Sequence, residues 1–248
     1  MASQFFILSG ITLLAYFIKG ITGFGNTLVM NSLFGFVKEN RFTTPVDLLL
    51  GTPANIYLAW KNRKNINFRV VLPLALAVLA GNIPGILLLK TGSDHLLKVI
   101  LGLVLIFLSI DMLRVPSPQR GAADRSRTGT VSLWIIGLVS GFLMGLYGIG
   151  ALLATYIARH ADNRCDYRGN LCFVFGVDNL FRLGGYWFQG ILNRQIGWFF
   201  LWLVPAAGCG MLLSAQTDQR FSDALVKRFV LILLAGSGLI LILKNIPV

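Results

Sequence analysis

The chain has 248 residues, of which 55% are apolar and 13% are charged, and its mean hydropathy is +0.72. This composition excludes a water-soluble globular fold, and the apolar residues form long blocks that few charges interrupt. The formal charge of +12 lies mostly in short segments between these blocks, so we expect a lipid bilayer and no nucleic acid as partner. A transmembrane β-barrel is also excluded, because its strands alternate apolar and polar residues. We therefore predict an all-α polytopic membrane protein.

Ten apolar runs follow one another along the chain. They cover residues 5–18, 28–37, 45–60, 70–89, 96–113, 131–144, 151–158, 171–190, 196–214 and 224–243. A helix needs about 20 residues to cross the hydrocarbon core of a bilayer. The first, second, sixth and seventh runs are clearly shorter than this, and they form two pairs that each flank a cluster of glycines.

The two glycine clusters indicate an internal duplication. Residues 20–26 read GITGFGN and residues 145–151 read GLYGIGA, so that three glycines of each cluster match at an offset of 125 residues. Gly85 and Gly210 match at the same offset. A repeat of this kind is the sequence signature of a fold built from two similar halves.

A polar segment separates the two halves. It contains two prolines and four arginines, and it shows no apolar periodicity, which is typical of an exposed linker. We therefore predict a first repeat in residues 1–113, a basic cytoplasmic linker in 114–130 and a second repeat in 131–248.

The basic residues distinguish two membrane topologies. If each short pair makes one crossing, the chain has eight spans in two four-helix repeats, with ten basic residues on either side. If each pair enters and returns as a re-entrant hairpin, the loops 61–69, 114–127, 159–168 and 216–228 share one side, with 14 basic residues against six on the other. Because basic loops stay in the cytoplasm, the sequence favours two inverted repeats, each a re-entrant broken-helix hairpin plus three transmembrane helices. Both termini then lie outside, and the expected location is the cell (inner) membrane.

The glycine loops predict a ligand site. Non-helical backbone inside hydrocarbon needs a covering of protein or a wet cavity, so we expect the two loops to face each other near the midplane. Each loop opens a short helix whose first turn offers free N–H groups and the positive end of the helix dipole. An anion would bind there beside Gly23, Gly25, Gly148 and Gly150. The alternative is that these glycines only permit close helix packing.

Uncharged polar residues near the loops leave two interpretations open. Asn26 and Thr27 begin the second arm of the first pair, where they suit the N-cap position, or Asn26 offers its amide to a ligand oxygen. Asn55, Asn82 and Asn179 either line a polar path or form hydrogen bonds between helices.

A charge inside an apolar block is costly and by default functional. Lys19 either extends to the interface or faces the cavity as the counter-charge of an anion. Asp178 and Arg182 lie four residues apart on one helix face, so they can form a structural ion pair. Alternatively, Asp178 holds Arg182 for bidentate contact with the anion or itself exchanges a proton. Asp47 lies near the end of its block, where an interface position explains it.

The paired glycine signature in 20–26 and 145–151, the chain length, the basic linker and the high hydropathy resemble the TauE/SafE sulfite exporter family, also called the toluene-sulfonate uptake permease family. Members often carry a longer glycine run followed by a proline, whereas Asn26 and Ala151 interrupt the run here. The resemblance implies a permease for small sulfur-containing anions such as sulfite, a sulfonate or sulfoacetate.

We therefore predict a secondary transporter for such an anion, with two halves that rock around a midplane site. A passive anion channel is the alternative. A polytopic membrane enzyme is less well supported, because no His, Cys or paired-carboxylate site is convincing, and we expect no catalytic residue, cofactor or metal. A proton or a sodium ion remains open as the coupling ion, and the oligomeric state remains open as well, a homo-oligomer included.

Overall fold

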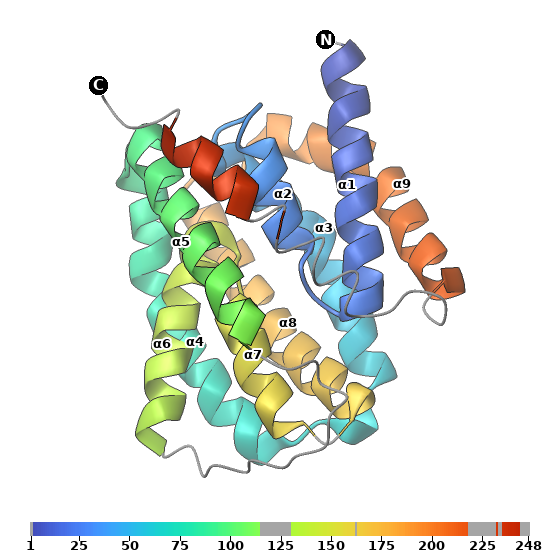
Figure 1. Ribbon diagram of the computed structural model, residues 1–248, viewed down its shortest axis with the longest axis vertical. Helices are drawn as coiled ribbons and strands as arrows, with labels where there is room; N and C mark the ends of the chain where they lie inside the picture. The colour runs from blue at the N-terminus through green and yellow to red at the C-terminus, as the bar shows by residue number, and fades with distance from the viewer. Residues whose placement is uncertain (1, 115–129, 162, 218–231, 233–234, 244–248) are drawn as a thin grey trace.

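The computed structural model describes residues 2–114, 130–161, 163–217, 232 and 235–243, and these residues form helices without any strand (Figure 1). The predicted all-α class is therefore confirmed. The helices are α1 (Ala2–Thr22), α2 (Asn26–Phe34), α3 (Asn40–Lys61), the 3-10 turn η1 (Arg63–Asn65), α4 (Phe68–Thr91), α5 (Asp94–Arg114), α6 (Thr130–Tyr147), α7 (Ala151–His160), α8 (Arg164–Phe188) and α9 (Arg194–Thr217), and residues 235–243 are also helical. The predicted linker 114–130 lies outside the described residues except at its two ends.

The described helices are long and apolar enough for a membrane protein. Those that can cross a bilayer by length and composition are Phe5–Thr22, Phe68–Thr91 and Arg194–Gln216, while Val131–Tyr147 is apolar but shorter. The first of them exceeds the apolar run 5–18, because the helix continues through Lys19 and Gly20 to Thr22. By length and composition this helix could cross a bilayer, which the run 5–18 alone could not.

Large apolar side chains cover the outside of the helix bundle. Phe6 is 81% exposed, and Phe107, Leu201 and Trp202 are each more than half exposed. A water-soluble protein rarely exposes large contiguous apolar surface of this kind, whereas lipid tails solvate it. The exposed surface thus supports the membrane location that the composition predicts.

The chain breaks its helices at both glycine clusters. Gly23 and Gly25 have φ values of 82° and 96°, and Gly148 has a φ of 74°, in the left-handed region that favours glycine. In Figure 1, α1 descends from the N-terminus and α2 turns back toward that end, whereas α6 rises from the opposite end and α7 turns back downward. The breaks therefore reverse the chain and do not merely kink a helix.

The fourth α-helix of each half packs on the first helix of the other half. The closest pairs are α4 with α6 and α1 with α9. A Cβ atom on Gly141 would overlap the carbonyl oxygen of Val78, and one on Gly210 would overlap that of Leu13. Gly145 lies equally close to the backbone of Asn82. The small-residue explanation thus holds for the glycines at these helix contacts.

Replacing Gly141 by alanine should destabilise the protein, because the new methyl group meets backbone that cannot move away. Overpacking of this kind costs about 1–3 kcal/mol. We expect a lower thermal unfolding midpoint in detergent for Gly141→Ala. Gly208→Ala is the matched control, since that helical glycine has open space around its Cβ position. Equal midpoints for the two variants would contradict the packing described.

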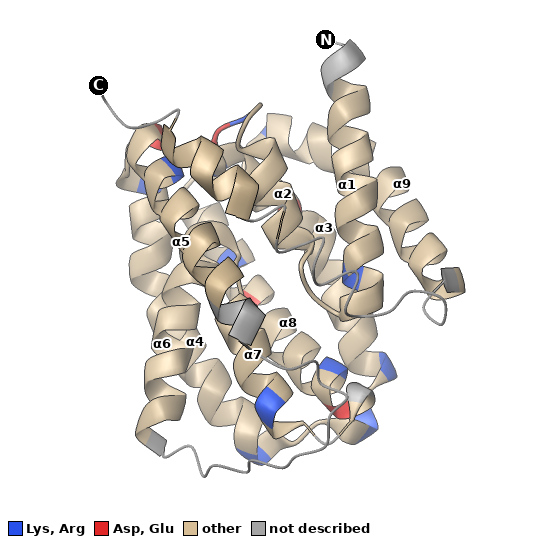
Figure 2. Ribbon diagram, in the orientation of Figure 1, with Lys and Arg blue, Asp and Glu red and all other residues tan. Residues whose placement is uncertain are grey.

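The basic loops 61–69 and 159–168 lie at the same end of the molecule (Figure 2). Asn65 Nδ2 donates to Asp166 Oδ1 at 2.9 Å, and the backbone N–H of Asn67 donates to Asn170 Oδ1 at 2.8 Å. These bonds join the loop 61–69 to the segment 159–170, which come from different halves of the chain.

Candidate functional site

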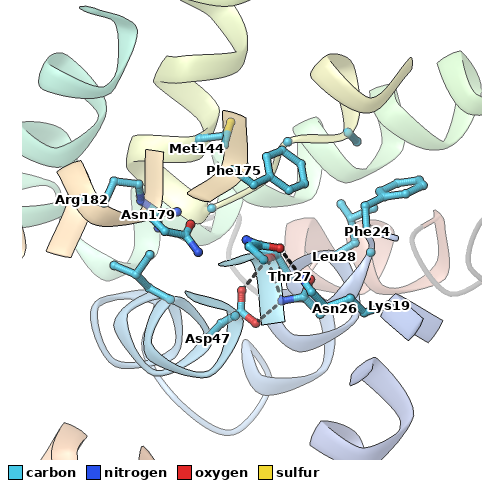
Figure 3. A pocket seen from close by; sticks show the side chains of 17 residues that line it. Lys19, Phe24, Asn26, Thr27, Leu28, Asp47, Met144, Phe175, Asn179 and Arg182 are labelled. Carbon is cyan, nitrogen blue, oxygen red and sulfur yellow. Dashed lines mark hydrogen bonds between the residues drawn. The ribbon is translucent and has the colours of Figure 1, made fainter. Parts of the chain in front are cut away.

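A pocket lies between the two helix breaks (Figure 3). The centres of water-sized molecules have about 30 Å³ of room in it, and the space between its atoms, open solvent included, is about 430 Å³. Its lining residues are Lys19, Phe24, Gly25, Asn26, Thr27, Leu28, Asp47, Leu48, Gly51, Asn55, Met144, Gly148, Gly150, Ala151, Phe175, Asn179 and Arg182. The two glycine loops, which are more than a hundred residues apart in the sequence, therefore border one pocket.

Most of the predicted site residues meet at this pocket. Those that line it are Lys19, Gly25, Asn26, Thr27, Gly148, Gly150 and Arg182. Gly23 and Asp178 are outside the lining. The side chain of Arg168 covers Gly23, because a Cβ atom there would lie 3.3 Å from Arg168 Cγ. Asp178 precedes Arg182 by one helical turn on α8.

Both short helices point their N-termini at the pocket. Gly25 is the N-cap of α2 and Gly150 is the N-cap of α7, and neither cap has a side-chain hydrogen bond. The first intrahelical bonds start at Val29 and Ala154, so the N–H groups of 26–28 and 151–153 precede them. The N-cap role considered for Asn26 and Thr27 is therefore wrong, since Gly25 holds that position.

Asp47 is buried at the pocket and is 4% exposed. Its Oδ1 accepts from Asn26 Nδ2 at 2.7 Å and from Tyr16 Oη at 3.5 Å, and its Oδ2 accepts from Thr27 Oγ1. The interface position expected for Asp47 is wrong. The reason is that α3 begins at Asn40, before the apolar run, so that Asp47 lies two turns inside the helix.

Lys19 faces the pocket. It is 1% exposed, and its Nζ donates to Asn26 Oδ1 at 3.0 Å and to Asn55 Oδ1 at 2.8 Å. The side chain does not extend to the interface, which was the other interpretation. Asn26 uses both ends of its amide, because its oxygen accepts from Lys19 while its nitrogen donates to Asp47 (Figure 3).

Arg182 belongs to a second polar cluster, on α8. One of its nitrogens, Nη1, lies 3.6 Å from Asp178 Oδ2, so the predicted ion pair is present. Nη2 donates to Tyr186 Oη at 2.9 Å, which donates in turn to the carbonyl oxygen of Gly145 at 3.1 Å. Asn82 Nδ2 donates to the other oxygen of Asp178. These contacts fix where the guanidinium lies.

The guanidinium of Arg182 contacts the second helix break. A Cβ atom on Gly148 would lie 3.2 Å from both Nη1 and Nη2 and 3.0 Å from Cγ2 of Thr27. Arg182 is 2% exposed, and its Nε has no hydrogen-bond partner among the described residues. This buried donor is therefore unsatisfied in the structure.

Three side chains that contact the predicted site residues or their loops were not themselves predicted. Tyr16 and Tyr186 lie one helical turn from Lys19 and Arg182, so their helical spacing is a signal that could have found them. Arg168 is different. It reaches from α8 to the carbonyl oxygen of Ile21 at 2.6 Å, and nothing in a basic loop sequence predicts this contact.

The pocket combines two helix N-termini, two cationic side chains and one carboxylate that neutral donors surround. This set of groups can hold a small anion by charge-assisted hydrogen bonds. Within the described residues, no group of three or more His, Cys, Asp and Glu side chains could hold a metal ion.

Comparison with known proteins gives one family. The sequence profile described as Sulfite exporter TauE/SafE matches residues 8–241, nearly the whole chain. No curated protein and no solved structure matches.

Proposed function

Since the chain belongs to the sulfite exporter TauE/SafE family, we propose that it is a secondary transporter that carries one small sulfur-containing anion across the inner membrane. The family consists of membrane transporters of sulfur anions and not of enzymes. Sulfite, a short sulfonate and sulfoacetate are the substrates that we expect.

The observation that carries this proposal is the meeting of Lys19 and Arg182 with the N-termini of α2 and α7 at one pocket. Each helix end contributes unpaired N–H groups and a partial positive charge, and each side chain contributes a full one. A sulfite or sulfonate group has three oxygens that can accept from several donors at once. The planar guanidinium of Arg182 suits two of these oxygens in a bidentate contact.

Asp178 is proposed to position Arg182 without touching the anion. It lies outside the pocket lining, and Asn82 holds its second oxygen. The long separation of 3.6 Å from Nη1 leaves the guanidinium free to bind a ligand at the same time. The ion pair thus compensates for the burial of Arg182 in the empty pocket.

Three observations support two inverted repeats with re-entrant hairpins. The two broken helix pairs run in opposite directions (Figure 1). The packing of α4 on α6 matches that of α9 on α1. A hydrogen bond joins the basic loops 61–69 and 159–168 at one end of the molecule, whereas eight spans would put these loops on opposite sides. We therefore assign this basic end to the cytoplasm and both termini to the outside.

The two repeats, 1–113 and 131–248, are proposed to rock around the pocket. Each broken helix is held by a side chain from the other repeat, since Arg168 binds the end of α1 and Asn31 donates to the carbonyl oxygen of Tyr147 at the end of α6. When the pocket changes its opening from one side of the membrane to the other, one of these two contacts would break while the other stays. The anion shifts the equilibrium between the two states only by its differential affinity for them.

Flux through reconstituted liposomes tests the proposal. We expect uptake of sulfite, thiosulfate or a short sulfonate at a rate that saturates with concentration, and exchange of labelled for unlabelled anion across the bilayer. Liposomes without protein give the background. Large currents that do not saturate would instead support a passive anion channel. The absence of flux for every anion of the panel would contradict both functions.

A further inference from the structure

A carboxylate on the wall of an anion pocket needs an explanation. Asp47 lines the same pocket as Lys19 and Arg182 and is almost fully buried. An ionised carboxylate repels an anion that enters this pocket, and the low dielectric of the interior strengthens the repulsion. A site selected only for anion affinity would therefore carry a neutral residue here.

The partners of Asp47 stabilise an ionised carboxylate. Asn26, Thr27 and Tyr16 donate hydrogen bonds to its two oxygens. All three donors are neutral, so none of them cancels the negative charge. Lys19 contacts Asn26 and Asn55 and makes no ion pair with Asp47 within 4.0 Å. Lys19 and Arg182 attract Asp47 from a longer distance, but neither forms a direct ion pair with it, so its charge still acts on a guest.

We propose that Asp47 carries the coupling proton, so that the anion and one proton bind the pocket together. This inference rests on the proposed function. The proton comes from water on the side to which the pocket is open and forms an O–H bond with a carboxylate oxygen of Asp47. The neutral carboxyl group no longer repels the anion, and its O–H can donate to Thr27 or to an oxygen of the anion. On the other side, the O–H bond breaks and the proton returns to water as the anion leaves.

The surroundings of Asp47 favour a proton over a sodium ion. Hard cations bind to several oxygen ligands at once. The groups that contact the carboxylate are the donors Asn26 Nδ2, Thr27 Oγ1 and Tyr16 Oη, and their N–H and O–H groups already occupy its oxygens. Lys19 lines the same pocket and would repel a second cation. A proton needs only one lone pair and displaces none of these groups.

Asp47 fits this role better than Asp178, the other buried carboxylate of the site. Asp178 is paired with Arg182 at 3.6 Å and lies outside the pocket lining, so its charge is already compensated. Of the charged and titratable groups around Asp47, α1 supplies Tyr16 and Lys19 and α8 supplies Arg182. The partners from α2 are uncharged.

Proton uptake during anion binding tests this inference. We would titrate the purified wild-type protein with ethanesulfonate, which stays ionised between about pH 5 and 8, in buffers of different ionisation enthalpy. The heats should show the uptake of about one proton per anion, and affinity should rise by up to about tenfold per unit of falling pH. Asp47→Asn should bind the anion with no proton uptake and with affinity independent of pH.

One further variant makes the test specific. Glu39→Gln is the matched control, because Glu39 is an exposed carboxylate at the start of the same helix and its side chain makes no cap hydrogen bond, so this variant should keep the wild-type proton uptake. Proton uptake that persists in Asp47→Asn, or that disappears in Glu39→Gln, would overturn the inference.

The wild-type measurement decides the question even if Asp47→Asn does not fold. Binding of ethanesulfonate without proton uptake would overturn the inference and leave the anion site intact. So would binding that requires sodium, tested by replacing sodium with choline. Absence of binding of ethanesulfonate and of every anion in the flux panel, at every pH, would overturn the proposed function and the inference together.

Discussion

Adding one methyl group at Gly148 will weaken anion binding by about 10- to 100-fold. Gly148 has a φ of 74°, and a Cβ there would lie 3.2 Å from both terminal nitrogens of Arg182. The guanidinium must move, and it then loses contacts with the ligand, each worth about 1.5–3 kcal/mol for a charged hydrogen bond. Calorimetric binding of ethanesulfonate to purified Gly148→Ala measures this loss directly.

Gly23→Ala is the matched control for this variant. Gly23 occupies the equivalent position of the first repeat and has a similar φ of 82°, so alanine strains the backbone by about 1–2 kcal/mol at either position. The neighbour of Gly23 is the aliphatic part of Arg168, outside the pocket lining. We therefore expect both variants to lose similar stability and only Gly148→Ala to lose affinity. Equal losses of affinity would show that backbone strain, and not the position of Arg182, controls binding.

The helix breaks could be predicted from the sequence because glycine is the direct cause of each. Three of the glycines at the breaks have positive φ values, which other residues rarely adopt, and a matching cluster in each half is a local pattern. The pairing of Asp178 with Arg182 was predictable for a similar reason, since helical spacing alone places the two side chains on one face.

The burial of Asp47 at the pocket could not be predicted, because the limits of an apolar run are not the limits of a helix. The run begins at residue 45, whereas α3 begins at Asn40, where the backbone N–H donates to Asp94 Oδ1 at 3.3 Å. This contact joins segments that are distant in the sequence. With α3 starting this early, Asp47 lies inside the bundle, where Asn26 and Thr27 contact it.

The side chains that complete the pocket in the second half could not be predicted from the duplicated motif. The first half places Asn26 and Thr27 at the start of its short helix, where the second half has Ala151 and Leu152. The second half compensates from another helix, since Arg182 on α8 reaches the glycine loop of its own repeat. Tertiary contacts, and not the duplicated motif, thus decide which side chains complete the pocket.

Replacing Arg182 separates its proposed binding role from its structural role. Arg182→Lys keeps the positive charge beside Asp178 but lacks the planar donor fork. We expect a folded protein that binds the anion about tenfold more weakly. Arg182→Gln removes the charge and leaves Asp178 buried without its ion-pair partner, which costs about 3–5 kcal/mol. This variant should lose both stability and transport.

The double variant Asp178→Asn with Arg182→Gln separates the loss of stability from the loss of transport. Both side chains are then neutral and can hydrogen-bond to each other, so the cost of the unpaired carboxylate disappears and the unfolding midpoint should recover. Transport should not recover, because the guanidinium that we propose to bind the anion is still missing. Flux in liposomes and thermal unfolding of the same preparations measure the two properties side by side. If transport returned together with stability, Arg182 would serve only to balance Asp178, and the anion would have to be held by Lys19 and the two helix N-termini.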